Sequence, residues 1–378
     1  MRKQITILII AMTASLSSFA QSTATEWYDK GTSLKKEKKY TEAITAFKKA
    51  VSFRANYAEA LHGLGWCYNE EGQYDEAISA LIKEYNAGPA NRAYNKFELG
   101  YAYKGLAKYD DALDYFNKAI DIDPEYTLAF KERGNTYFKQ KEYDKATEDY
   151  DRYEKLADGD ITDATYYYNR GWILNEKEQY ADAVPLIKKA ISMDNKYKSA
   201  YTELGYTYYK LNLNDDALNN YRKAAALDPQ DYQPWLGIAN TYYDNLKNTD
   251  SALVYYKKST RVEKPSKTAY YRLGWCYNDM EKYALAIDPL KQAVILDADY
   301  ASARNELGYA YYKLDRYDEA LAQFRPVMAA NEKDELSRYY AGFCYYLKDD
   351  QASLKKMIAE LRELNSTKYV ETLTKYLK

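Results

Sequence analysis

Residues 99–112 read LGYAYKGLAKYDDA, and variants of this phrase recur along the rest of the chain. The position of Gly100 belongs to a series whose successive spacings along the chain are 34, 35, 34, 37, 34, 34, 35, 34 and 34. A nearly constant interval of this length indicates a stacked array of similar units rather than one ordinary core. The small residues that mark the units are Gly31, Gly65, Gly100, Gly134, Gly171, Gly205, Ala239, Gly274, Gly308 and Gly342.

A second small residue keeps step with the first. In the first nine units it stands at the twelfth place after the landmark, or at the thirteenth in the unit of Ala239, and is alanine: Ala43, Ala77, Ala112, Ala146, Ala183, Ala217, Ala252, Ala286 and Ala320. Two small residues at this separation predict a close crossing of two antiparallel helices. The apolar residues around them have helical spacing, as in Leu99, Tyr103, Leu113, Phe116 and Ala119.

Proline marks the ends of some units. Asp123-Pro124 and Asp228-Pro229 should end the preceding helix, because proline cannot continue a helix and disfavours the helical conformation in the residue before it.

Small residues at the eighth and twentieth positions of a 34-residue helix-turn-helix unit, with a late proline, resemble the tetratricopeptide repeat. We count ten units that begin near residues 24, 58, 93, 127, 164, 198, 232, 267, 301 and 335. The resemblance implies an all-α, right-handed superhelical solenoid of antiparallel helix pairs over residues 21–365. In the tenth unit we expect a shortened turn at residues 348–350. Within residues 366–378 we expect a capping helix from Thr367 to Leu377 that covers the last repeat with Val370, Leu373 and Leu377.

A longer period of three units is also present. The residues after the small landmarks run Trp66, Tyr101, Asn135, then Trp172, Tyr206, Asn240, then Trp275, Tyr309, Phe343. An asparagine lies three positions after each tryptophan, and a Glu-Leu pair marks the middle unit of each triplet: Asn69, Asn175 and Asn278, with Glu98, Glu203 and Glu306. Duplication of a three-repeat block could by itself produce this pattern.

The family resemblance also implies a binding face. Positions two, five, nine and twelve of each first helix would line a concave groove. Over the last nine units nearly half of these positions are aromatic, and the charged ones are Glu59, Lys104 and Lys131. Rigid aromatic rings and amides suit extended peptides and sugars. The predicted ligand-contact residues are Trp66, Asn69, Tyr101, Lys131, Asn135, Trp172, Asn175, Tyr206, Asn240, Trp275, Asn278 and Tyr309.

Two alternative roles for these aromatic residues stay open. Tyrosine is common in the family at positions five and twelve. Tyr168, Tyr271, Tyr209 and Tyr312 could therefore follow the family's usual sequence without contacting a ligand. The three tryptophans could instead stack against the neighbouring repeat.

Lys131 and Asn135, with Asn169, lie where chaperone-binding members of the family grip a C-terminal carboxylate. The match ends in the next unit, where Ser199 and Glu203 take the places of the expected cations. A complete carboxylate clamp is therefore not expected.

Catalytic and metal chemistry find little support in the sequence. His62 is the single histidine, and no phosphate loop, nucleophile elbow or dinucleotide fingerprint is present. Cys67, Cys276 and Cys344 share the tenth position of well-separated units, so we expect buried free thiols rather than disulfides. Acidic pairs at the starts of the second helices should cap them and offset their dipoles, as at Asp110, Asp111, Asp215, Asp216, Asp318 and Glu319. We expect no enzymatic activity, no cofactor and no metal.

The N-terminus resembles an export signal. Arg2 and Lys3 precede an apolar run from Ile5 to Leu16, and Ser18-Phe19-Ala20 supplies a small-residue cleavage site. We expect residues 1–20 to be removed and the mature chain to be periplasmic or secreted, without a membrane span. A net charge of -2 gives no reason to expect nucleic acid as a partner. The predicted function is that of a scaffold for a protein or peptide partner, and the alternative is a protein that binds carbohydrate or cell-wall fragments.

Overall fold

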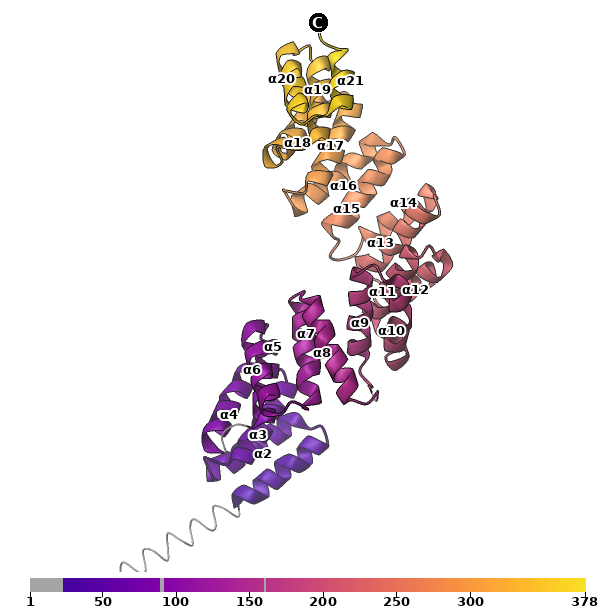
Figure 1. Cartoon of the computed structure of the whole chain (residues 1–378). Coiled ribbons are helices and arrows are strands. Elements are labelled where there is room, and N and C mark those ends of the chain that lie inside the picture. Colours follow the sequence, from indigo (N-terminus) through magenta and orange to yellow (C-terminus); the bar gives the residue numbers. More distant parts are fainter. Residues whose placement is uncertain (1–22, 89–91, 160) are drawn as a thin grey trace, which may run out of the picture. The chain divides into compact units, whose positions relative to one another are not determined.

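The computed structural model describes residues 23–88, 92–159 and 161–378. Within these ranges the chain is helical and contains no strand, and most helices pack against the next one in sequence (Figure 1). The predicted all-α class of paired helices is thereby confirmed. The predicted export signal, residues 1–20, lies outside the described residues. The chain divides into two compact units, up to Ile173 and from Leu174 onward.

The first unit holds four helix pairs and the beginning of a fifth. Its first helix covers residues 23–36. The helices that follow are α2 (Tyr40–Phe53), α3 (Ala58–Glu70), α4 (Tyr74–Ala87), α5 (Ala93–Gly105), α6 (Tyr109–Ile122), α7 (Thr127–Lys139), α8 (Tyr143–Leu156) and α9 (Ala164–Glu176), which continues into the second unit.

The second unit continues the same alternation of helices. Its helices after α9 are α10 (Tyr180–Met193), α11 (Lys198–Lys210), α12 (Asn214–Leu227), α13 (Tyr232–Asn240), η1 (Thr241–Asn245), α14 (Thr249–Ser259), α15 (Lys267–Asp279), α16 (Tyr283–Leu296), α17 (Ala301–Lys313), α18 (Tyr317–Ala330), α19 (Glu335–Leu347), α20 (Gln351–Glu363) and α21 (Thr367–Thr374). The Asp-Pro pairs end their helices as predicted, since Asp123 and Asp228 are extended directly after α6 and α12.

The landmark glycines are small for a different reason from the one the spacing suggested. A methyl group added to Gly100 would lie 2.7 Å from Cδ1 of Phe116, and one added to Gly65 would lie 2.6 Å from Cγ of Leu81. The side chain that needs this space therefore lies one helical turn after the landmark alanine. That alanine is fully buried as well, as Ala112 shows. Gly65 and Gly100 thus leave space for a large side chain of the second helix, which packs directly against them.

The turn between the two helices of a pair has a constant form. Three residues separate the helices, and the middle one adopts a positive φ, as at Gly72 (71°), Ala107 (57°) and Asp349 (58°). The predicted shortening of the turn at residues 348–350 is wrong, because it has the same three residues as the turn at 106–108. The tenth unit departs elsewhere. Leu354 replaces the landmark alanine, and a methyl group added to Gly342 would lie 2.6 Å from Cδ1 of Leu373 in α21.

The extra residue in the seventh unit is absorbed by a π-helix. Residues Thr241–Asn245 continue α13 with wider turns, in which the amide of Leu246 donates to the carbonyl oxygen of Thr241 at 3.1 Å. A π turn holds one more residue than an α turn, so the second helix still begins in register with the rest of the array.

The last helix covers the end of the array. Leu373 is fully buried in a cluster with Leu354, Ile358 and Leu361, and Val370 and Leu377 pack against the edge of that cluster. The helix itself ends at Thr374, three residues before the predicted end.

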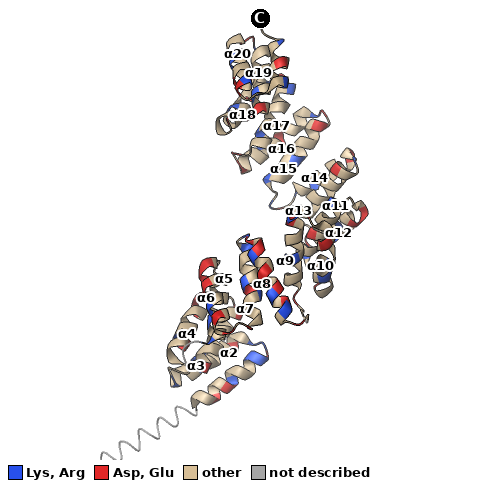
Figure 2. Ribbon diagram, in the orientation of Figure 1, with Lys and Arg blue, Asp and Glu red and all other residues tan. Residues whose placement is uncertain are grey.

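Charge and hydropathy are distributed without large blocks. Basic and acidic residues are interspersed in both units (Figure 2). The acidic pairs lie in the first turns of α6, α12 and α18, where they offset the helix dipole, but none of these helices has a side-chain N-cap hydrogen bond. The capping role predicted for them is therefore wrong.

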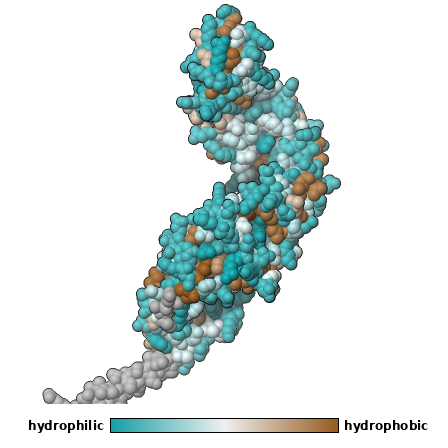
Figure 3. Space-filling view, viewed as in Figure 1, coloured by the Kyte–Doolittle hydropathy of each residue, from teal (hydrophilic) through white to brown (hydrophobic). Residues whose placement is uncertain are grey.

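On the face visible in Figure 3, apolar residues are scattered among hydrophilic ones. None of the helices described is long and apolar enough to cross a membrane.

Candidate binding sites on the groove face

We call the surface formed by positions two, five, nine and twelve of the first helices the groove face. Its three tryptophans are half-buried against the preceding repeat. The separations of ring centroids are 5.5 Å for Tyr40 and Trp66, 5.0 Å for Tyr143 and Trp172, and 4.6 Å for Tyr243 and Trp275. Trp172 also meets Phe138 at 5.1 Å. Stacking against the neighbouring repeat is thus present, while part of each indole stays accessible. Ligand contact through that accessible part remains a prediction.

The three asparagines that follow the tryptophans link one repeat to the next. The side-chain amide of Asn69 donates to Oε2 of Glu98 at 2.7 Å and to its backbone oxygen at 3.0 Å. Asn278 donates to the corresponding atoms of Glu306 at 2.8 Å and 3.0 Å. Asn175 donates to Oε1 of Glu203 at 2.6 Å and to Oγ1 of Thr207 at 2.8 Å. Their NH₂ groups are therefore engaged within the protein, whereas their Oδ1 atoms are buried and accept no hydrogen bond from the described residues.

The three glutamates are held in a poorly solvated environment. Burial raises the pKa of Glu98 and of Glu306 above the ordinary value, and it raises that of Glu203 to about 7. In each case the asparagine N–H acts in the opposite direction, because it stabilises the ionised carboxylate. The three-unit period in the sequence indicated these glutamates, but it did not predict that each would accept a hydrogen bond from an asparagine.

The asparagines at the ninth position, Asn135 and Asn240, tie the two helices of a pair together. Each accepts a hydrogen bond at 2.9 Å from a tyrosine hydroxyl of the second helix, Tyr150 or Tyr256. Asn169 also donates to Oδ1 of Asn135 at 3.1 Å, so two members of the suspected carboxylate clamp bond to each other.

The third member, Lys131, is neutralised within the protein. Its ammonium lies 2.9 Å from Asp163 and 3.3 Å from Glu132. Burial acts to lower its pKa, but the charges of the two carboxylates outweigh burial and raise it. Lys104 pairs with the same Glu132. With both groove lysines paired, an incoming carboxylate would have to compete with existing ion pairs.

The three predicted tyrosines, Tyr101, Tyr206 and Tyr309, keep exposed ring surface. The ammonium of Lys104 lies 4.6 Å from the ring centroid of Tyr101. The other two rings meet the tyrosine that opens the preceding second helix edge to face, Tyr180 with Tyr206 at 6.3 Å and Tyr283 with Tyr309 at 5.9 Å. The sequence analysis did not include these opening tyrosines among the site residues. Their constant place, three residues before the landmark alanine, could have indicated them.

Each unit has a cavity on the groove face. The first cavity, of about 430 Å³, is lined by Lys35, His62, Trp66, Glu70, Tyr94, Phe97, Glu98, Tyr101, Tyr126, Leu128, Lys131 and Glu132. The second cavity, of about 310 Å³, is lined by Trp275, Asn278, Asp279, Glu281, Tyr283, Asn305, Glu306, Tyr309, Leu336 and Tyr340. Tryptophan, glutamate and tyrosine occupy the same repeat positions in both, so the three-repeat period places equivalent cavities in the two units.

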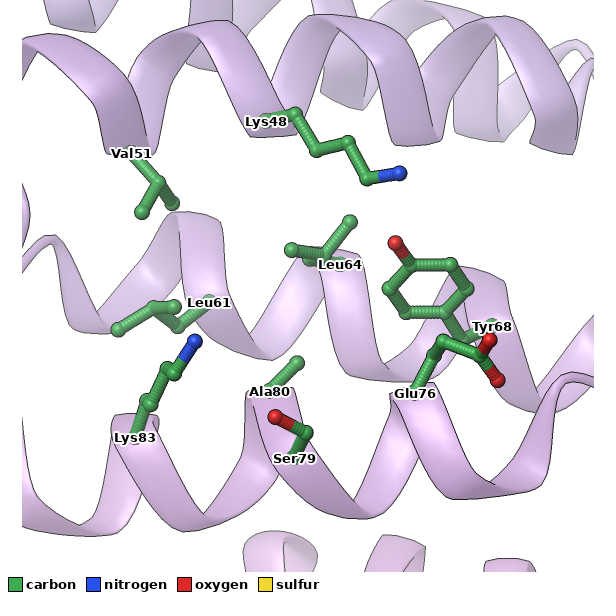
Figure 4. Close-up of a pocket in the computed structure, with 9 residues that line it drawn as sticks. All are labelled: Lys48, Val51, Leu61, Leu64, Tyr68, Glu76, Ser79, Ala80 and Lys83. Atoms are coloured by element: carbon green, nitrogen blue, oxygen red, sulfur yellow. The ribbon is translucent and has the colours of Figure 1, made fainter.

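A further depression lies on another face of α3, between α2 and α4. Leu61, Leu64 and Tyr68 form its floor, and Lys48 and Lys83 flank it (Figure 4). Its volume is about 260 Å³. The ammonium of Lys48 lies 5.4 Å from the Tyr68 ring, and equivalent lysine-tyrosine pairs recur at Lys188 and Tyr208 and at Lys291 and Tyr311. Because this contact repeats along the array, we interpret it as packing between repeats. It contains none of the predicted ligand-contact residues.

The three cysteines are buried and unpaired, as predicted. Burial raises the pKa of Cys67 and Cys344 to about 12 and that of Cys276 to about 11, which disfavours the reactive thiolate form. Within the described ranges no three His, Cys, Asp or Glu side chains are grouped so that they could hold a metal ion.

Comparison with known proteins identifies the family. Models described as "Tetratricopeptide repeat" match residues 34–93, 96–126, 164–197, 202–265, 268–300 and 301–333, together more than half of the chain. The chain belongs to the tetratricopeptide repeat family.

Individual relatives are distant. Human "Tetratricopeptide repeat protein 6" is 28% identical over 173 residues, which are 45% of this chain and 32% of that protein. "Anaphase-promoting complex subunit 6" of Arabidopsis thaliana is 25% identical over 200 residues, 52% of this chain and 37% of that protein. The chain thus spans about a third of the length of these curated relatives. The solved structure "Crystal structure of YrrB: a TPR protein with an unusual peptide-binding site" is similar with a TM-score of 0.46 and 24% identity, over 50% of this chain and 98% of that one.

Proposed function

We propose that this chain is an exported, non-catalytic scaffold that binds an extended segment of a partner protein on the groove face. The observation that carries the proposal is the recurrence of equivalent cavities, each with an accessible tryptophan and tyrosine beside a hydrogen-bonded asparagine-glutamate pair. Packing alone could use any apolar side chain at these positions. Large, partly exposed aromatic rings beside polar groups are typical of surfaces that anchor a partner.

Three further observations support parts of this proposal. The name of the relative "Anaphase-promoting complex subunit 6" is that of a component of a protein assembly. Export is supported by the sequence of residues 1–20. A role without catalysis agrees with the residue chemistry of the cavities, where the carboxylates of Glu98 and Glu306 are already bonded to asparagine.

The experiment is a binding screen with protein that begins at Gln21, against arrays of extended peptides and of glycans. Trp66→Asn and Trp275→Asn should reduce binding of the hits. These substitutions also remove the contacts with Tyr40 and Tyr243, so each needs a matched control. Tyr40→Leu removes the same ring contact but leaves Trp66 in place. If Tyr40→Leu weakens binding as much as Trp66→Asn does at equal stability, the tryptophan is a packing residue and the proposed binding face is wrong.

A carbohydrate or cell-wall fragment is the second candidate ligand. It is favoured by the second cavity, where indole and phenol rings lie beside Asn278, Asp279 and Glu306, which could accept hydrogen bonds from hydroxyl groups. Salt distinguishes the candidates. Binding of a neutral glycan should be independent of ionic strength, whereas binding of a charged peptide should weaken as salt is added.

A further inference from the structure

Two asparagines of the second unit keep a buried oxygen without a hydrogen-bond donor. Asn175 and Asn278 are 3% and 6% exposed. Their NH₂ groups are engaged, but their Oδ1 atoms are buried and accept no hydrogen bond from the described residues. A buried acceptor without a donor destabilises the fold. Because neither oxygen is open to a ligand, a donor for it has to come from the protein itself.

The orientation of the Asn278 amide is determined by its partners. Its NH₂ group donates to the backbone oxygen of Glu306 at 3.0 Å and to Oε2 of the same residue at 2.8 Å. The reverse orientation would point Oδ1 at that backbone oxygen, so that two acceptors would face each other. The carboxyl group is therefore the member of the pair that can become a donor, by binding a proton.

The Asn175 amide has an equivalent arrangement. It donates to Oε1 of Glu203 at 2.6 Å and to Oγ1 of Thr207 at 2.8 Å. The Thr207 hydroxyl is itself used, because it donates to the backbone oxygen of Glu203 at 2.8 Å. Here too the carboxyl group is the one that can gain a donor.

The surroundings of Glu203 disfavour a negative charge. The charged group that acts on it is another carboxylate, that of Glu176 at the end of α9. Tyr206 of α11 and Tyr221 of α12 also face it. Burial raises the pKa of Glu203 to about 7, and Glu176 acts in the same direction.

Glu306 has a similar setting. Three tyrosines face it, from α15, α17 and α19, and two carboxylates line the same cavity: Tyr271, Tyr309, Tyr340, Asp279 and Glu281. The basic side chains nearby lie on aromatic rings, Arg272 on Trp275 at 5.7 Å and Lys313 on Tyr309 at 6.0 Å. Burial raises the pKa of Glu306 above its ordinary value.

We propose that Glu203 and Glu306 each hold a proton in the folded chain and donate it to Oδ1 of the asparagine that bonds to them. Each pair is then a neutral acid-amide pair, in which the amide N–H donates to one carboxyl oxygen and the carboxyl O–H donates to the amide oxygen. Loss of the proton leaves Oδ1 unpaired and introduces a charge into the contact of α9 with α11, or of α15 with α17. The two contacts are thus a pH-sensitive device that acid tightens and alkali weakens. It needs no partner molecule and does not depend on the proposed function.

Two other pairs with an unpaired asparagine oxygen have a different electrostatic setting. Lys35 and His62 act on Glu98 and favour its carboxylate form. Nδ1 of His62 also lies 3.4 Å from Glu84, to which Asn95 donates. Because a basic side chain faces each of these carboxyl groups, the proposal is confined to Glu203 and Glu306.

The first test is carbon-13 nuclear magnetic resonance of the mature protein, with label in the side-chain carboxyl and amide carbons, from pH 4 to pH 9. The Cδ signal of Glu203 should titrate with a midpoint at about pH 7, and that of Glu306 above the ordinary 4.5. Glu203→Gln and Glu306→Gln identify the two signals by removing them, whereas Glu332→Gln, at an exposed position, should keep both. Midpoints at or below the ordinary value would overturn the proposal.

The amide carbons show where the proton goes. A hydrogen bond to an amide oxygen deshields the amide carbon, so the Cγ signals of Asn175 and Asn278 should move downfield as the pH falls. Each should move with the midpoint of its own glutamate. In Glu203→Gln the Asn175 signal should stay downfield at every pH, because the glutamine NH₂ group donates to Oδ1 without titrating. An upfield movement on acidification, or none, would show that Oδ1 gains no donor and would also overturn the proposal.

Hydrogen exchange measures the effect on the contact between the helices. At pH 8 the backbone amides of α11 should exchange about tenfold or more slowly in Glu203→Gln than in the natural protein, because only the natural protein has lost the proton. The difference should disappear near pH 4.5, and Glu306→Gln should act in the same way on α17. Glu332→Gln should exchange like the natural protein at both pH values. Equal exchange of all these proteins at pH 8 would show that the contacts do not depend on the proton, and the proposed device would be wrong.

Discussion

Replacement of Glu203 by glutamine should stabilise the protein at neutral and alkaline pH. The carboxyl group lies in the interface between α9 and α11, where Asn175 donates to it at 2.6 Å. Burial raises its pKa from the ordinary 4.5 to about 7. A glutamine side chain keeps the oxygen that accepts the asparagine N–H and removes the charge that burial disfavours.

The sign and size of the effect follow from proton linkage. The folded chain binds the Glu203 proton more tightly than the unfolded chain, so this group contributes stability below about pH 4.5 that is lost as the pH rises to about 7. The loss amounts to roughly 3 kcal/mol at most, at about 1.4 kcal/mol for each tenfold change in proton affinity. Glu203→Gln does not suffer this loss, so its advantage over the natural protein should be near zero at pH 4 and should reach roughly 2–3 kcal/mol at pH 8.

The assay is urea denaturation followed by circular dichroism at pH values from 4 to 8, with the variant and the natural protein compared at each pH. The difference between the two curves isolates Glu203, because all other carboxyl groups are common to both proteins. Glu332→Gln serves as the control. This glutamate is exposed, so its replacement removes a carboxyl group without changing a buried contact. A Glu203→Gln protein that is equally or less stable at pH 8 would refute the argument that burial dominates at this site.

Three other predictions concern packing, turns and thiols. Gly100→Ala should lower the free energy of unfolding by about 1–3 kcal/mol, measured by urea denaturation, because the new methyl group would collide with Phe116. Gly72→Ala should lower the free energy of unfolding by about 1 kcal/mol through its positive φ alone, since no atom lies within 4 Å of the added carbon. Ala107→Gly, at another positive φ, should raise the free energy of unfolding. If both substitutions change it in the same direction, backbone strain is not the cause. The thiols should react slowly with a disulfide reagent in the folded protein and rapidly in denaturant, with about three equivalents per chain and no intramolecular disulfide. Fast reaction of the folded protein would show that one of them is accessible: Cys67, Cys276 or Cys344.

The asparagine-glutamate pairs give a physical meaning to the three-repeat period. Each pair joins the first unit of a triplet to the second through a hydrogen bond that is at least partly buried. In the third unit of two triplets, an asparagine-tyrosine hydrogen bond instead joins the two helices of the same unit. Buried polar bonds of this kind specify which surfaces meet, because any other register would leave the glutamate and the asparagine unpaired. The three-unit period therefore corresponds to a repeated set of hydrogen bonds between repeats, whether or not duplication first produced it.

The sequence alone determined the helical architecture. The spacing of the small residues predicted the helix pairs, although the space that each glycine leaves is filled by a large side chain such as Phe116. The one irregular spacing inside a unit, between Ala239 and Ala252, also indicated an extra residue in the seventh unit. Both signals are local, so they can be read from residues that are close in sequence.

The partners of the site residues were decided by the tertiary structure. Asn69, Asn175 and Asn278 look available in the sequence, yet their NH₂ groups are taken by glutamates of the following repeat. Whether Lys131 is free depends in the same way on Asp163. Spacing fixes the face of a helix on which a residue lies, but the hydrogen bonds and charges around it depend on which side chains the next repeat brings into contact. Only the folded chain determines that.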